Sequence, residues 1–214
     1  MRVQRACCTF SVALGTLITM SSAQAVDGSK IYNEGGGDPA AIACATCHGA
    51  DGRGLGPAGF PRLAGLSPAY LAKQLADFKS GSRDNPVMKP IASALGDEEV
   101  KAVVAMLSAM PSPETRHVTR VDLADSPGAV LALRGAWGRN IPECVACHGP
   151  GAVGVGDHFP PLAGQSAEYL SAQLNAWRDG SRKNDPNDLM GHIARSMTDE
   201  EVSAVAAYFA GLSH

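Results

Sequence analysis

The chain has 214 residues, of which 45% are hydrophobic, 18% charged and only 5% aromatic. This is a globular composition, long enough for one large domain or two small ones, and it excludes a disordered or fibrous chain. The formal net charge is −3 and no run of Lys or Arg occurs, which excludes the positive surface that nucleic-acid binding needs.

The first 25 residues have the pattern of a secretory signal peptide. Arg2 and Arg5 supply a positive start, residues 6–20 an apolar segment, and Ala23-Gln24-Ala25 a small-residue cleavage site. We expect export to the periplasm and a mature chain that begins at Val26, whose net charge changes from −3 to −5 because two arginines leave. A membrane anchor is the alternative, but about 15 apolar residues fall short of the roughly 20 that span a bilayer.

The four cysteines that remain after cleavage form two copies of the pattern Cys-x-x-Cys-His, at residues 44–48 and 144–148. This pattern is typical of haem c attachment. Residues i and i+3 of a helical turn share a face, so both thiols can bond to one porphyrin while the adjacent histidine reaches the iron. We therefore expect two covalent haem c groups, held by Cys44, Cys47, Cys144 and Cys147, with His48 and His148 as iron ligands.

Two other uses of four cysteines stay open at this point. An even number of cysteines in an exported chain often forms disulfides. A four-cysteine zinc site is also conceivable, although the two motifs, 100 residues apart, would have to converge on one ion.

Helical patterns follow the first haem motif. Ser67 is a typical N-cap, Pro68 a typical first helical residue and Gly81 a typical C-cap, with apolar residues on one face between them. Another helix begins at the acidic turn 97–100. No segment alternates with period two for long enough to form a strand, so we predict an all-α fold.

The chain is an internal duplication. The segments 60–65, 70–75, 81–83 and 97–100 recur at 159–164, 169–174, 180–182 and 199–202. The offset grows from 99 to 102, which predicts a three-residue insertion in the polar run 183–189. We predict a first domain at 26–112, a linker at 113–125 and a second domain at 126–214. The boundary between the two halves lies near residue 117, and proline at both ends of the connecting segment stiffens it.

The two final helices differ at their starts. Thr198 and Glu201 have the spacing of a capping box. Gly96 replaces the threonine in the first half, so we expect a weaker cap there.

The repeat also selects sixth ligands for the two irons. Met88 and Met190 lie nine residues before Asp97 and Asp199, in segments that we predict to be turn-like. Other side chains lack this symmetry: Met106 and Met110 read as core residues of an apolar helix, and Met197, His158 and His192 have no matching residue in the first half.

These units resemble those of the dihaem cytochromes of the cytochrome c4 family, from Ile31 to Leu212: the paired haem motifs, Phe-Pro-x-Leu-Ala-Gly, Tyr-Leu-x-x-Gln-Leu and Gly-x-Arg. The resemblance implies two tandem class I cytochrome c domains related by a pseudo-twofold axis. It also implies the axial pairs His48 with Met88 and His148 with Met190.

The resemblance further implies that the carbonyls of Pro61 and Pro160 orient the two histidines. It places Arg83 and Arg182 near haem propionates; a solvated arginine at a helix end is the alternative reading of both. The halves also depart from each other, since Leu66 corresponds to Gln165 and Arg62 to Pro161. We therefore expect two unlike haem surroundings and two different potentials.

The implied function is an electron carrier, not an enzyme, that passes single electrons between redox protein partners, toward a terminal oxidase. An alternative is the electron-accepting subunit of an exported dehydrogenase, like that of flavocytochrome c sulfide dehydrogenase or an alcohol dehydrogenase. A dihaem peroxidase is disfavoured, because paired methionines leave no open iron. The negative mature chain predicts at most weak attraction to an anionic membrane surface, with no transmembrane anchor after cleavage.

Overall fold

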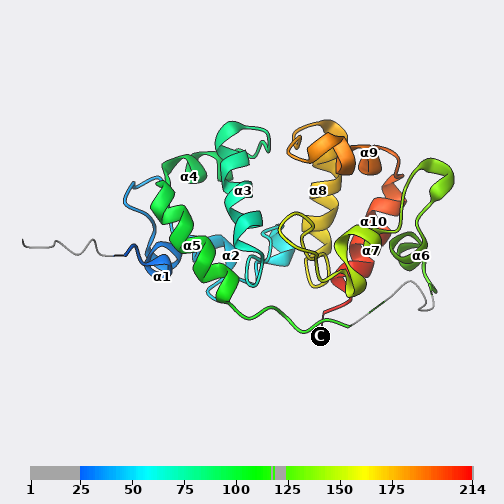
Figure 1. Cartoon of the computed structure of the whole chain (residues 1–214), viewed down its shortest axis with the longest axis horizontal. Coiled ribbons are helices and arrows are strands. Elements are labelled where there is room, and N and C mark those ends of the chain that lie inside the picture. Colours follow the sequence, from blue (N-terminus) through cyan, green and yellow to red (C-terminus); the bar gives the residue numbers. More distant parts are fainter. Residues whose placement is uncertain (1–24, 117, 119–123, 214) are drawn as a thin grey trace, which may run out of the picture.

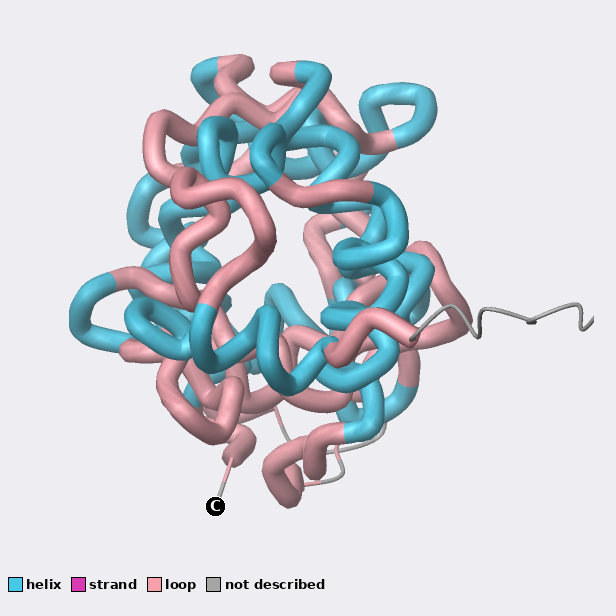
Figure 2. Tube along the Cα trace, turned by 90° about the vertical axis from the view of Figure 1, so that its left-hand side faces the viewer, coloured by secondary structure: helices cyan, strands magenta, loops and turns pink. Residues whose placement is uncertain are grey.

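The computed structural model describes residues 25–116, 118 and 124–213 (Figure 1). Almost all of the predicted signal peptide and part of the predicted linker lie outside these residues, so the domain boundaries stay predictions. Figure 2 shows only helices and loops in the described chain, which confirms the all-α fold.

The described residues form two sets of helices in the same order. The first half contains α1 (Gly28–Glu34), α2 (Ala45–His48), the 3-10 turn η1 (Gly56–Ala58), α3 (Pro68–Ser80), α4 (Met88–Ala94) and α5 (Asp97–Ala109). The second half contains α6 (Pro127–Arg134), η2 (Trp137–Arg139), α7 (Cys144–His148), η3 (Pro150–Ala152), α8 (Ala167–Asp179), η4 (Pro186–Asp188), α9 (Leu189–Arg195) and α10 (Asp199–Ala210).

Each half packs its helices in the same way around its own apolar core. In the first half α1 and α3 both pack on α5, and in the second half α6 and α8 both pack on α10. The two halves lie side by side along the long axis of the molecule (Figure 1). The duplication read from the sequence is therefore a duplication of structure.

A glycine lies at the crossing of the first and last helices of each half. A Cβ atom on Gly28 would lie 2.2 Å from the carbonyl oxygen of Ala102, and one on Gly128 would lie 2.2 Å from that of Ala204. Because any side chain would meet backbone at these points, the close helix approach requires glycine.

The long helix α3 begins and ends where the sequence predicts, and α8 has the same two caps in the second half. The Ser67 and Ser166 hydroxyls accept from the backbone N–H groups three residues later, and both helices end at a glycine with positive φ, Gly81 and Gly180. Serine caps the free N–H groups, and glycine adopts the left-handed conformation without a steric penalty.

The methionine segments differ from expectation. We predicted turn-like segments, but Met88 is the first residue of α4 and Met190 the second residue of α9. A side-chain cap explains the first helix, because Asn85 Oδ1 accepts from the N–H groups of Val87 and Met88 at 3.0 and 2.8 Å. The predicted insertion coincides with η4, which the first half lacks and which has positive φ at Asn187.

The described part of the predicted linker packs on the second half. The Arg116 N–H donates to the Leu212 carbonyl at 2.7 Å, Thr115 pairs with Ser213, and Val118 is buried in the second core. This stretch of the chain is thus fixed to one half (Figure 1).

The caps of the two final helices differ as expected and predict a difference in stability. Thr198 and Glu201 form both bonds of a capping box, whereas Gly96 has no side chain and only Glu99 caps its N–H, at 2.8 Å. Thr198→Ala should cost about 1 kcal/mol of unfolding free energy and Gly96→Thr should gain a few tenths of a kcal/mol, measured by urea denaturation. An unchanged midpoint for Thr198→Ala would show that its hydroxyl contributes nothing.

Candidate haem sites

The two motif histidines have the same environment. His48 Nδ1 lies 3.0 Å from the Pro61 carbonyl oxygen, and His148 Nδ1 lies 2.7 Å from that of Pro160. Because a carbonyl only accepts, each Nδ1 carries the proton and each Nε2 keeps a free lone pair. The two imidazoles are thus prepared to bind a metal through Nε2, and the structure has the proline contacts that the family resemblance implies.

Burial keeps both rings neutral. His48 and His148 are each 7% exposed, and this burial lowers the pKa of both, with the proline carbonyl acting weakly in the opposite sense. Phe60 and Phe159 contact the rings edge-on, with centroids 6.3 and 6.2 Å apart. The Phe-Pro pair of each repeat thus both packs against and orients its histidine.

The four cysteines are half-buried thiols at the two short motif helices. None forms a disulfide. Burial raises the pKa of the Cys44 thiol, and raises that of Cys144 to about 12, so both are neutral thiols. No group of three or more His, Cys, Asp or Glu side chains in the described residues could hold a metal ion, so the zinc alternative is wrong. These pairs fit two thioether bonds to one porphyrin in each half.

Met88 and Met190 are half-buried in equivalent places. Their helices, α4 and α9, lie toward the top of each half in Figure 1, whereas α2 and α7 lie toward the bottom. The histidine and methionine of each half thus come from separate sides. Of the other residues considered, Met106 and Met110 pack against the first core, Met197 is buried in the second core, and His158 and His192 are exposed.

Arg83 and Arg182 are not solvated, so that alternative is wrong. They are 7% and 6% exposed, and their backbones form an isolated antiparallel bridge across the boundary between the halves. The pairing is symmetric: the Asp84 N–H donates to the Ser181 carbonyl and the Lys183 N–H to the Ser82 carbonyl, both at 2.7 Å. This arrangement is that of a pseudo-twofold axis. Their placement near haem propionates stays a prediction.

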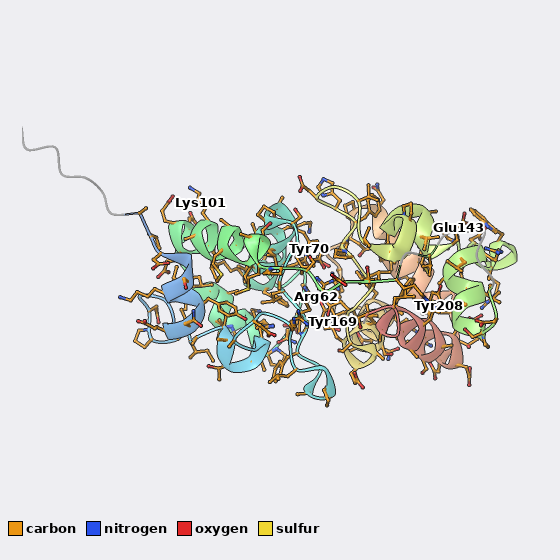
Figure 3. The ribbon with its side chains drawn as sticks, turned by 90° about the horizontal axis from the view of Figure 1, so that it is seen from below. Arg62, Tyr70, Lys101, Glu143, Tyr169 and Tyr208 are labelled. Atoms are coloured by element: carbon orange, nitrogen blue, oxygen red, sulfur yellow. The ribbon has the colours of Figure 1, made fainter. Side chains whose placement is uncertain are left out.

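The two guanidinium groups share partners from both halves. Arg83 donates to Gln74, to the Tyr169 hydroxyl and to Gln173 at 2.7–3.0 Å, and Arg182 donates to the same two glutamines at 2.9 and 3.3 Å. Figure 3 shows Tyr169 and Tyr70 in the middle of the long axis, between the halves. The boundary is therefore polar and extensively hydrogen-bonded.

The sequence did not reveal the role of Tyr32. This residue of α1 is fully buried, its hydroxyl donates to the Gly49 carbonyl at 2.5 Å, and burial raises its pKa to about 12. The Tyr32 hydroxyl therefore fixes Gly49, the residue that directly follows His48. The equivalent position in the second half is Ala132, so a comparison of the repeats could have identified it.

Comparisons with known proteins identify the family. A family model described as cytochrome c matches residues 25–111 and 138–213. A cytochrome c4 of Thiocapsa roseopersicina is 40% identical over 79% of this chain and 87% of its own length. The chain is a dihaem cytochrome c of the cytochrome c4 family. This cytochrome is also 65% identical to a protein of Stutzerimonas stutzeri named thiosulfate dehydrogenase electron acceptor, over 93% of this chain and 92% of that protein.

Solved structures of the same fold agree. The reduced recombinant cytochrome c4 of Pseudomonas stutzeri has a TM-score of 0.69 and 33% identity, and covers 79% of this cytochrome and 93% of its own chain. A thiosulfate dehydrogenase of Marichromatium purpuratum has a TM-score of 0.76 and 45% identity over 86% of this cytochrome. The match spans only 39% of that longer chain.

The family settles the cofactor and the broad function. This cytochrome holds two haem c groups in two tandem domains and transfers electrons. Among its described residues, no helix has both the length and the apolar character that a membrane span requires.

Proposed function

We propose that this cytochrome accepts electrons from an exported dehydrogenase that oxidises thiosulfate, and passes them singly to a further redox protein in the periplasm. The observation that carries the proposal is the level of identity. Relatives named thiosulfate dehydrogenase electron acceptor are 65% and 48% identical, whereas those named cytochrome c4 are 30–40% identical.

We assign the axial pairs His48 with Met88 and His148 with Met190, and the thioether bonds to Cys44, Cys47, Cys144 and Cys147. Each haem c supplies a one-electron ferric–ferrous couple when bound. The Nδ1–H bonds to Pro61 and Pro160 hold the imidazoles in one orientation and raise their basicity. If Met88 and Met190 held the irons together with the imidazoles, neither site would admit a small substrate, which favours a carrier over an enzyme.

The test is thiosulfate-dependent reduction of the holoprotein. The oxidised cytochrome is mixed with a purified thiosulfate dehydrogenase, and the ferrous α-band is followed after thiosulfate is added. We expect both haems to become reduced, with no reduction when either enzyme or thiosulfate is left out. A cytochrome c4 from the 30–40% identical group serves as the matched control acceptor. Equal or faster reduction of that control would contradict a dedicated acceptor.

A general carrier toward a terminal oxidase is the second candidate, supported by the relatives named cytochrome c4. It predicts that a quinol-oxidising complex reduces this cytochrome at least as fast as the dehydrogenase does. Sequencing the N-terminus of the exported protein tests the location, and we expect it to begin at Val26.

A further inference from the structure

Arg62 is a buried cation at the boundary between the halves (Figure 3). It is 3% exposed, its Nη1 donates to the Ala64 carbonyl at 2.8 Å, and its Nη2 lies 3.3 Å from the Ala163 carbonyl. Ala64 and Ala163 are equivalent residues of the repeat, so the guanidinium spans matching points of the two halves. None of the described carboxylates forms an ion pair with it, and its Nε has no partner.

Gln165 of the second half clamps the backbone of Arg62. Its Oε1 accepts from the Arg62 N–H at 3.0 Å and its Nε2 donates to the Arg62 carbonyl at 2.8 Å. Arg62 directly follows Pro61, whose carbonyl accepts the His48 proton. A side chain of the second half therefore holds the peptide that orients the histidine of the first half.

Among the described residues, no equivalent clamp exists in the opposite direction. The residue that corresponds to Gln165 is Leu66, which is buried in the first core and has no amide. The residue that corresponds to Arg62 is Pro161, which has no N–H to donate. The two departures from the repeat are therefore partners in one asymmetric contact that affects only His48.

We propose that Gln165 is a positioning residue through which the second half sets the reduction potential of the first haem centre, and that the charge of Arg62 raises the potentials of both centres. The inference rests on the proposed ligation by His48. A well-aligned Nδ1–H bond makes the imidazole a stronger donor, which favours ferric iron, so loosening it raises the potential. The buried guanidinium opposes the extra positive charge of ferric iron, so its removal lowers the potential. Loss of the Gln165 side chain should therefore raise the reduction potential, and loss of the Arg62 side chain should lower it.

The first test is Gln165→Leu, which copies the residue of the first half. In the ferrous holoprotein with ¹⁵N-labelled histidine, we expect the ring N–H of His48 to exchange about tenfold faster, because both hydrogen bonds that hold the Arg62 peptide are lost. The His148 ring N–H should be unchanged. Redox titration should show one midpoint potential raised and the other unmoved. If Gln165→Leu fails to assemble, Gln165→Met, which keeps the length but has no amide, replaces it.

The matched control is Asn184→Ala, another change between neutral residues at the boundary. It removes the side-chain bonds from Asn184 to Gln74 and Asp77, at 2.9 and 2.7 Å, and the bond that Asn184 accepts from Arg182, at 2.9 Å, none of which involves the Pro61 loop. We expect both ring N–H groups and both potentials to keep their wild-type values. The same change in both variants, or no change in Gln165→Leu, overturns the proposal.

The second test is Arg62→Met, which keeps the backbone clamp but removes the charge. Because the guanidinium spans both halves, we expect both equilibrium constants for reduction to fall by about tenfold, or about 59 mV for one electron, with the ring N–H exchange unchanged. Arg62→Lys should restore most of the loss. Unchanged or raised potentials in Arg62→Met overturn the electrostatic part. A wild-type protein without two slowly exchanging ring N–H signals would instead refute the two proline contacts on which the proposal is built.

Discussion

Met88→Ala and Met190→Ala are each expected to open one of the two irons to carbon monoxide and to lower the potential of that centre. An alanine methyl group cannot reach the iron, so the sixth position would be left to water or an added ligand. Thioether ligation favours ferrous iron, and we expect its loss to lower one potential by on the order of 100 mV, a modest part of the roughly 0.8 V range that axial ligands cover. The measurement is a carbon monoxide titration of the dithionite-reduced protein, with one equivalent bound per variant chain and two per double variant.

Two other methionines supply matched controls for this experiment. Met106 packs against the first core and Met197, 6% exposed, belongs to the second core. Met106→Ala and Met197→Ala should cost stability, about 2–5 kcal/mol at the fully buried position, without any binding of carbon monoxide. Carbon monoxide binding by a core variant, or its absence in both Met88→Ala and Met190→Ala, would refute the assignment of the sixth ligands.

Local signals in the sequence predicted long helices in both halves and both haem motifs. Ser67 and Gly81 set the two ends of α3 through bonds within one turn, so their effect depends little on the rest of the fold. The Cys-x-x-Cys-His spacing is local in the same sense. The turn expected at Met88 was wrong because one Asn85 side chain caps a helix there, and such a cap competes closely with a turn of similar sequence.

The contacts between the halves could not be predicted from short segments of the sequence. The departures at Arg62 and Gln165 were visible in the sequence, and they predicted unlike haem surroundings. Their direct contact was not predictable, because it joins residues 103 positions apart and depends on how the two domains dock. The burial of Arg83 and Arg182 has the same origin, since a helix-end arginine is solvated in an isolated domain and becomes buried only against its symmetric partner.

Gly128→Ala is expected to destabilise the second half by about 2–3 kcal/mol, the cost of overpacking a tight contact. Two effects oppose each other at this position. Alanine in a helix gains about 0.5–1 kcal/mol over glycine through lower backbone entropy in the unfolded chain. The new methyl group would lie 2.2 Å from the Ala204 carbonyl oxygen, which is backbone of α10 and cannot rotate aside. The steric cost of the methyl group exceeds the entropic gain of alanine. The measurement is urea unfolding together with amide hydrogen exchange of α6 and α10.

Gly138→Ala is the control that separates the two effects. Gly138 lies in η2, lacks positive φ, and a Cβ there would meet no atom within 4 Å. Its replacement should leave the second half unchanged or slightly more stable. Gly28→Ala should reproduce the Gly128→Ala loss in the first half, because its Cβ would meet the Ala102 carbonyl at the same 2.2 Å. If Gly128→Ala were instead as stable as Gly138→Ala, α6 and α10 could separate at little cost, and the close crossing would not be what holds the second half together.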